Sequence, residues 1–506
     1  MTQDAHTAPT HSGSTQRLLA DRVVTLVFLA VTGLAVLVVA SWLVLVVAHL
    51  DDGYGMDHVS GTWIALARYA NDGTLYPPLY DGESFGGTRF MPVPILLQAG
   101  AAHLSAEYLV SAKALSAILA LAVAVATFSI LRRRCPLPIA LLLSSTLLVT
   151  GTGLVAATSI RNDALPLLLQ LGALALVAAS TSRRTIVAAG FLCGAALFCK
   201  VSAVWGPATI AVYLARRSSR GVLVFAAAFV GLALCELVVF QLASSGRFAD
   251  NVLQLTATAS DRRGSLDDIL DRVRLIFREG LGPLVVLPLL ATLGVALAVR
   301  RRDLSIYHLA FVMSVVVTAV VLVDPGAYVN HLLDVQVLSL IVIGELWRQL
   351  TPGPRTLSWA AASLVVVLVA ATVATYGENM SLAADTRVLV HGTAARDRIP
   401  RLAGVVSDDE RVLSEDPFVP ASRGQRPVVL DSFMLLTLLE RHPEWRRDIV
   451  ERIESAEFDK IVLYYVPDEA PQWYRRVHLG PDVVGAIEAR YRPARHVDGY
   501  WIFVPR

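Results

Sequence analysis

The chain has 506 residues, of which 55% are hydrophobic and only 17% are charged, and its formal net charge is +2. Soluble globular domains carry roughly 25% charged residues, so this composition argues against a soluble protein and indicates a membrane protein. The near-neutral charge gives no support for nucleic-acid binding, which normally needs a basic face.

The chain begins with a polar segment, residues 1–22, which predicts a disordered cytoplasmic N-terminus. The apolar run from Val23 to Leu50 follows, and it is too long for a signal-peptide core. Because a membrane-crossing helix needs about 20 apolar residues, this run predicts the first span of a membrane core that covers residues 23–376. About eleven spans are expected: 23–50, 107–131, 136–158, 164–181, 185–199, 201–215, 221–243, 281–299, 304–323, 332–347 and 358–376.

The connections between these runs alternate in character. One set is short and basic, and the other set, 51–94, 159–163, 244–280 and 324–331, is longer or acidic. Basic connections of membrane proteins lie in the cytoplasm, so the N-terminus is expected inside and residues 377–506 outside the cell (inner) membrane. The basic set contains Arg17 and Arg22; Arg132, Arg133 and Arg134; Arg183 and Arg184; Arg216, Arg217 and Arg220; Arg300, Arg301 and Arg302; and Arg348 and Arg355.

The first outer connection, residues 51–94, is long and contains no span of its own. Long structured loops are usually functional. Residues 57–70 have the pattern of a short helix that lies on the membrane, and Gly73 is expected to end it. The loop therefore holds several acidic side chains at the outer surface of the membrane. These are Asp51, Asp52, Asp57, Asp72, Asp81 and Glu83.

This loop resembles the first loop of GT-C membrane glycosyltransferases, which include protein O-mannosyltransferases and lipid A aminoarabinose transferases. The resemblance consists of an acidic residue after the first span, a short helix, and Gly73-Thr74-Leu75-Tyr76-Pro77. Asp57 and Gly73 match the spacing in that family, although His58 replaces the usual second acid. The resemblance implies that Asp57 is the first-choice catalytic residue. Asp51 and Asp52 are second choices, because some members carry an acidic pair directly after the span.

The resemblance continues along the chain and covers most of it. Arg161-Asn162-Asp163 opens the fourth span, as an Arg-x-Asp does in the family, and Lys200 stands where an intramembrane lysine ends the fifth. The segment 328–334, with Asn330 and His331, resembles the last outer loop of the family's core, and segment 412–417 resembles the tail of bacterial members. The implied substrate-binding residues are His58, Arg89, Glu83, Arg161, Asp163, Lys200, Asn330 and His331.

The implied reaction moves a sugar from a polyprenyl-phosphate donor to a cell-envelope glycan, lipid or protein, by a hexosyl- or pentosyltransferase. One carboxylate suffices as base for the acceptor hydroxyl, and attack opposite the leaving phosphate inverts the anomeric centre. Nearby cations would stabilise the departing phosphate. No metal ligand is identified and no cofactor is required, but a divalent metal remains an open alternative, because some family members use one.

Each candidate also has a purely structural interpretation. Asp57 is a favoured helix N-cap, and a lysine at a span end often extends toward the interface. Asp51 or Asp52 could end the first span, and Arg161 could pair with Asp163. His58 could be a surface histidine, and Asn330 and His331 could cap a span.

The tail, residues 377–506, has the composition of a soluble domain. Segments 411–413, 427–430, 460–465 and 499–504 are expected to be strands, and segments 432–441 and 444–456 are expected to be helices. Strands that alternate with helices predict a small α/β domain. The sequence therefore predicts an α-helical polytopic membrane protein with a small extracytoplasmic α/β domain.

Two other functions compete with glycosyl transfer. A transporter or lipid flippase would be expected to show internal repeats and charges near the membrane midplane, but no repeat is evident. The third possibility is a scaffold whose outer domain binds a partner, which would need no acidic first loop.

Overall fold

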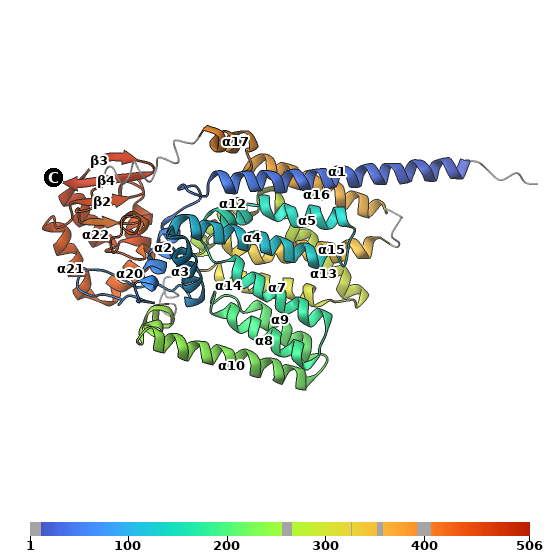
Figure 1. The fold of residues 1–506 in the computed structure, drawn as a ribbon, viewed down its shortest axis with the longest axis horizontal. Helices are drawn as coiled ribbons and strands as arrows, with labels where there is room; N and C mark the ends of the chain where they lie inside the picture. The colour runs from blue at the N-terminus through green and yellow to red at the C-terminus, as the bar shows by residue number, and fades with distance from the viewer. Residues whose placement is uncertain (1–11, 256–265, 325, 352–357, 392–405) are drawn as a thin grey trace, which may run out of the picture.

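The computed structural model describes residues 12–255, 266–324, 326–351, 358–391 and 406–506. A bundle of helices occupies most of the molecule, and a smaller α/β domain sits at one end of it (Figure 1). The first helix starts at Ser12, so residues 12–22 are helical and not disordered as expected, whereas residues 1–11 lie outside the described range. The helices of the bundle are α1 (Ser12–Ala48), α4 (Tyr108–Leu131), α5 (Leu137–Val149), α6 (Gly151–Thr158), α7 (Ala164–Ala179), α8 (Arg183–Leu197), α9 (Trp205–Ala215), α10 (Ser219–Ala243), η1 (Ala249–Gln254), α12 (Leu266–Leu281), η2 (Gly282–Val285), α13 (Val286–Arg301), α14 (Ile306–Val321), η3 (Val329–Leu332), α15 (Leu333–Leu350) and α16 (Trp359–Asn379).

Six helical segments in the described ranges are long and apolar enough to cross a membrane. The pair α5 and α6, which is bent by 66° at its break, would make a seventh. The chain is therefore a multi-pass membrane protein, but the expected number of about eleven spans is not confirmed. Every expected run is helical, yet α7, α8, α9 and α14 have only 16, 15, 11 and 16 residues, fewer than the roughly 20 that a span needs.

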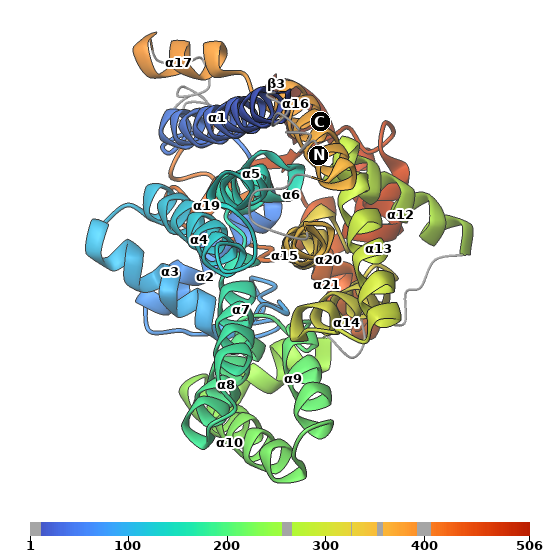
Figure 2. The ribbon, with the colours of Figure 1, turned by 90° about the vertical axis from the view of Figure 1, so that its right-hand side faces the viewer.

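Helix α15 lies at the centre of the bundle (Figure 2), in contact with α4, α5, α13, α14 and α16. Its residues from Val337 to Ile343 are all buried, which explains why this segment is almost entirely apolar. Helices α1 and α10 lie at the periphery and expose large apolar side chains, for example Leu29 and Leu242. Apolar residues on outward faces are what a lipid environment requires of a spanning helix.

The first outer loop forms two helices between the bundle and the α/β domain. Helix α2 (His58–Asn71) matches the expected helix, and Gly73 follows it with a positive φ of 82°, which glycine adopts readily. Residues Trp63, Ile64, Leu66 and Ala67 of α2 are buried, as the apolar pattern indicated. The sequence did not predict α3 (Pro92–Ser105), which packs between α2 and α4.

The α/β domain has a four-stranded sheet in the order β1-β2-β4-β3. Strand β1 is parallel to β2, and the other neighbouring pairs are antiparallel. The described elements are β1 (Val412–Ser414), α19 (Phe418–Ala421), α20 (Ser432–Arg441), α21 (Pro443–Glu454), β2 (Lys460–Leu463), η4 (Trp473–His478), α22 (Pro481–Arg490), β3 (Tyr491–Val497) and β4 (Tyr500–Pro505).

Two expectations for the tail need correction. Segment 427–430 is not a strand of this sheet, because Val429 forms an isolated parallel bridge with Phe85 of the first outer loop. Strand β3 was missed because its middle residues are exposed and carry no apolar alternation. Helix α17 (Leu382–His391) packs against α1 and lies away from the sheet (Figure 1).

Candidate functional site

A cavity of about 380 Å³ opens where the bundle meets the α/β domain. Its walls come from the first outer loop, the segment before α7, the break between α8 and α9, the segment around η3, and the start of α20. Seven of the eight expected substrate-binding residues line it: His58, Arg89, Arg161, Asp163, Lys200, Asn330 and His331.

Asp57 caps helix α2 and does not itself line the cavity, but it forms an ion pair with Arg161, which does. Its Oδ1 accepts hydrogen bonds from the backbone N–H of Ser60 at 3.0 Å and from the Ser60 hydroxyl at 3.1 Å. Its Oδ2 accepts from the guanidinium of Arg161, which lines the cavity wall. Capping and a functional role are therefore compatible here, because each uses a different carboxylate oxygen.

Burial and the neighbouring charges have opposite effects on the pKa of Asp57. Burial pushes the pKa of this carboxyl upward, but the Arg161 guanidinium and the capping N–H outweigh it and hold the pKa below its usual range. Burial, together with the neighbouring His478, lowers the pKa of His58 to about 4. At neutral pH the site therefore pairs an ionised Asp57, whose side chain is 34% exposed, with an uncharged His58.

Asp163 joins the two cations on the cavity wall. It pairs with Lys200, and both of its oxygens accept from Nδ2 of Asn330 at 3.0 Å. The Oδ1 of Asn330 in turn accepts from Nη1 of Arg161 at 3.4 Å. A continuous chain of contacts thus runs from Asp57 through Arg161, Asn330 and Asp163 to Lys200. Arg161 and Asp163, expected to pair with each other if structural, are linked through Asn330.

Arg89 also lines the cavity, and its partners are residues that the sequence did not indicate. Its Nη1 lies 2.8 Å from Oδ2 of Asp324, and its guanidinium lies 5.0 Å from the ring centre of Phe433. Asp431, the N-cap of α20, also lines the cavity. The sequence could have indicated each aspartate separately, because Asp324 ends an apolar run and Asp431 precedes a predicted helix. That they lie near Arg89 follows only from the fold.

Three other candidates, Asp51, Asp52 and Glu83, also do not line the cavity, and their expected roles stay predictions. Asp51 is exposed and Asp52 is fully buried, and neither lines the cavity. Oδ2 of Asp52 lies 2.7 Å from Nδ1 of His49, and Nζ of Lys113 lies 3.5 Å from its Oδ1. The contacts with His49 and Lys113 hold the Asp52 carboxylate in a buried network at the end of α1. The Glu83 side chain is exposed, and its backbone carbonyl accepts a hydrogen bond from Arg452 of the α/β domain.

The α/β domain contributes a buried carboxylate–histidine pair next to α2. Glu415 accepts from Nδ1 of His478 at 2.8 Å and from Nε1 of Trp473 at 2.7 Å. Hydrogen bonds from His478 and Trp473 offset burial and hold the pKa of Glu415 below its usual range. The ring of His478 lies 5.0 Å from that of His58. Sequence reasoning missed this pair because its members are 63 positions apart.

In the part of the chain that the structure describes, no group of three or more His, Cys, Asp or Glu side chains could hold a metal ion. No chemical step is assigned to the divalent metal that the family resemblance left open.

No protein-family model and no curated protein matches the sequence. Solved structures do resemble the fold. ArnT from Cupriavidus metallidurans, bound to undecaprenyl phosphate, has a TM-score of 0.58 and 15% identity over 93% of this chain and 98% of its own. The oligosaccharyltransferase AglB from Archaeoglobus fulgidus, in complex with an inhibitory peptide and a dolichol-phosphate, has a TM-score of 0.54 and 11% identity over 95% of this chain and 74% of its own. The chain therefore shares its overall fold with these two proteins.

Proposed function

We propose that this protein is an inverting glycosyltransferase that moves a sugar from a polyprenyl-phosphate donor to an acceptor hydroxyl of the cell envelope. The main supporting observation is the chain of contacts that ties the carboxylate of Asp57 to Arg161 and Lys200, two cations that line the cavity. The carboxylate can act as the base for the acceptor alcohol. The two cations can bind the phosphate that leaves the sugar donor.

Unsatisfied donors on the wall support an anion site. Nε of Arg161 and Nδ2 of Asn162 are buried and have no hydrogen-bond partner among the described residues. Buried donors are nearly always paired in native proteins, so a ligand with several acceptor oxygens would satisfy them. A phosphate has this chemistry, and ArnT and AglB, which share the fold, were solved with polyprenyl phosphates.

In the proposed reaction, the acceptor hydroxyl gives its proton to Oδ2 of Asp57, and its oxygen forms a bond to the anomeric carbon. The bond from that carbon to the phosphate oxygen breaks on the opposite face, and the configuration inverts. The electron pair leaves with the polyprenyl phosphate, whose added charge Arg161 and Lys200 stabilise. The leaving phosphate is a weak base, so no general acid is required.

The donor and acceptor are tested first in cells. Deleting the gene should cause a polyprenyl-phosphate sugar to accumulate and a surface glycan, lipid or protein to lack one sugar residue, and the wild-type gene should restore both. Extracted lipids and released glycans would be compared by mass spectrometry. Sugar or lipid uptake by proteoliposomes without any transfer would contradict the proposal and favour a transporter.

Replacing Lys200 with Met should lower kcat/KM about 10²–10³-fold, because removing one donor to developing charge costs about that much. The variant keeps the side-chain length, and Asn330 still donates to both oxygens of Asp163, so the fold should persist. Transfer would be measured with purified protein and a short-chain polyprenyl-phosphate sugar.

Lys460→Met is the matched control, since Lys460 pairs with Glu410 in the α/β domain away from the cavity. It should transfer sugar at the wild-type rate. Unchanged kcat/KM in Lys200→Met would show that this lysine only extends toward the interface.

A further inference from the structure

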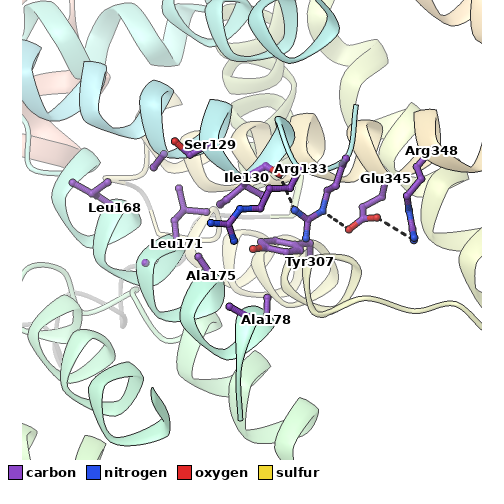
Figure 3. Close-up of a pocket in the computed structure, with 14 residues that line it drawn as sticks. Ser129, Ile130, Arg133, Leu168, Leu171, Ala175, Ala178, Tyr307, Glu345 and Arg348 are labelled. Carbon is purple, nitrogen blue, oxygen red and sulfur yellow. Dashed lines mark hydrogen bonds and ion pairs between the residues drawn. The ribbon is translucent and has the colours of Figure 1, made fainter. Parts of the chain in front are cut away.

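A second cavity, of about 550 Å³, lies at the far end of the bundle (Figure 3). It is bordered by the ends of α4 and α15, by the start of α14, and by α7 from Leu168 to Ala179. The first cavity lies before α7, at Asp163, so the two cavities have different lining residues. This end carries the basic connections that the positive-inside rule assigns to the cytoplasm.

The polar part of this second cavity carries more positive than negative charge. Glu345 is its only lining carboxylate in the described ranges, and it is shared by Arg134 at 2.6 Å and Arg348 at 3.4 Å. The guanidinium of Arg134 also lies over the ring of Tyr307, 4.5 Å from its centre. Arg133 forms no ion pair with a carboxylate in the described part of the chain, and it extends over the cavity (Figure 3). An anion in this cavity could therefore bind Arg133, whose charge no described carboxylate neutralises, next to Arg134 and Arg348, which both pair with Glu345.

The remaining wall is apolar and open to the lipid. Small side chains of α7, including Gly172, Ala175 and Ala178, form a recess between larger residues such as Leu168 and Leu171. Ala178 and Ala179, which line the cavity, are exposed, so this part of the wall faces outward from the bundle. A soluble anion would use only the arginine end, whereas a lipid would fill both parts.

We propose that this cavity binds an anionic phospholipid of the cytoplasmic leaflet, with its phosphate on Arg133 and one acyl chain along the small residues of α7. Basic pockets between membrane helices on the cytoplasmic side recognise such head groups. The lipid would hold the ends of α4, α7 and α15 together. This site is separate from the proposed donor site, and its test does not depend on sugar transfer.

The test measures lipid affinity of the purified full-length protein in detergent by native mass spectrometry. Phosphatidylglycerol should bind more tightly than phosphatidylcholine with the same acyl chains. Arg133→Gln should weaken phosphatidylglycerol binding about fivefold, as expected for one basic residue near a membrane surface. Arg132→Gln is the matched control, because Arg132 is the neighbouring exposed residue and does not line the cavity.

A second pair of variants tests the apolar part. Ala178→Trp fills the recess and should weaken phosphatidylglycerol binding at least as much as Arg133→Gln, whereas Leu176→Trp, outside the cavity, should not. Equal losses from Arg132 and Arg133 would mean general surface attraction. Equal binding of both lipids, or displacement by millimolar inorganic phosphate, would likewise overturn the proposal.

Discussion

Asp57→Asn is expected to lower kcat about 10²–10⁴-fold, the usual contribution of a positioned general base. The substitution removes the base but keeps the helix, because Asn is as good an N-cap as Asp and can still accept from the N–H of Ser60. The low pKa of Asp57 means that the wild-type carboxylate is ionised at neutral pH and ready to accept a proton. Transfer would be measured with purified protein, and α2 integrity by the thermal unfolding midpoint.

Asp51→Asn provides the control for this prediction. Asp51 precedes the same helix and is exposed away from the cavity, so this variant should retain wild-type transfer. Wild-type activity in Asp57→Asn would remove Asp57 from the reaction and leave capping as its role. A loss in Asp51→Asn alone would point to the acidic pair after the first span.

Lys113→Met is expected to destabilise the fold by about 3–5 kcal/mol, the cost of removing one partner of a buried ion pair. Lys113 is 2% exposed, and its Nζ donates to the backbone carbonyls of His49 at 2.6 Å and Asp52 at 2.7 Å. The variant leaves these carbonyls without their donor, and it leaves the fully buried Asp52 carboxylate with His49 and the backbone N–H of Tyr54 but without its lysine. This is a large share of the roughly 5–15 kcal/mol by which proteins are stable.

The effect would be followed as the thermal unfolding midpoint in detergent, together with the yield of folded protein. Lys460→Met, on the partly exposed surface of the α/β domain, should change the midpoint little. The double variant Lys113→Met with Asp52→Asn should recover part of the loss, because it removes the uncompensated charge. An unchanged midpoint in Lys113→Met would show that this contact does not stabilise the end of α1.

Lys200 and Lys113 show what the position of a lysine in the sequence can and cannot indicate. An ionisable residue within an apolar run is a functional candidate by default, which drew attention to Lys200. Lys113 lies in a run of the same kind, but its Nζ serves backbone carbonyls of the chain after α1. The two differ only in which segments the fold places opposite them, and no local pattern records that.

The first outer loop shows the same division. The spacing from Asp57 to Gly73 predicted helix α2 and its end correctly, because capping and a left-handed glycine are local requirements. The choice between Asp57 and Asp52 depended on distant partners. Arg161 is 104 positions from Asp57, and Lys113 is 61 positions from Asp52. Both aspartates form ion pairs, but only the pair of Asp57 borders the cavity.

The amino-acid sequence by itself determined that this is a multi-pass membrane protein with a short helix in its first outer loop and a small α/β tail, because apolar run length, capping residues and charge alternation act over a few turns of chain. It did not determine which apolar helices are long enough to cross the membrane or where segment 427–430 pairs. Nor did it reveal that Glu415 meets His478 beside α2. Those contacts join residues tens to hundreds of positions apart, and only tertiary packing brings them within hydrogen-bonding distance.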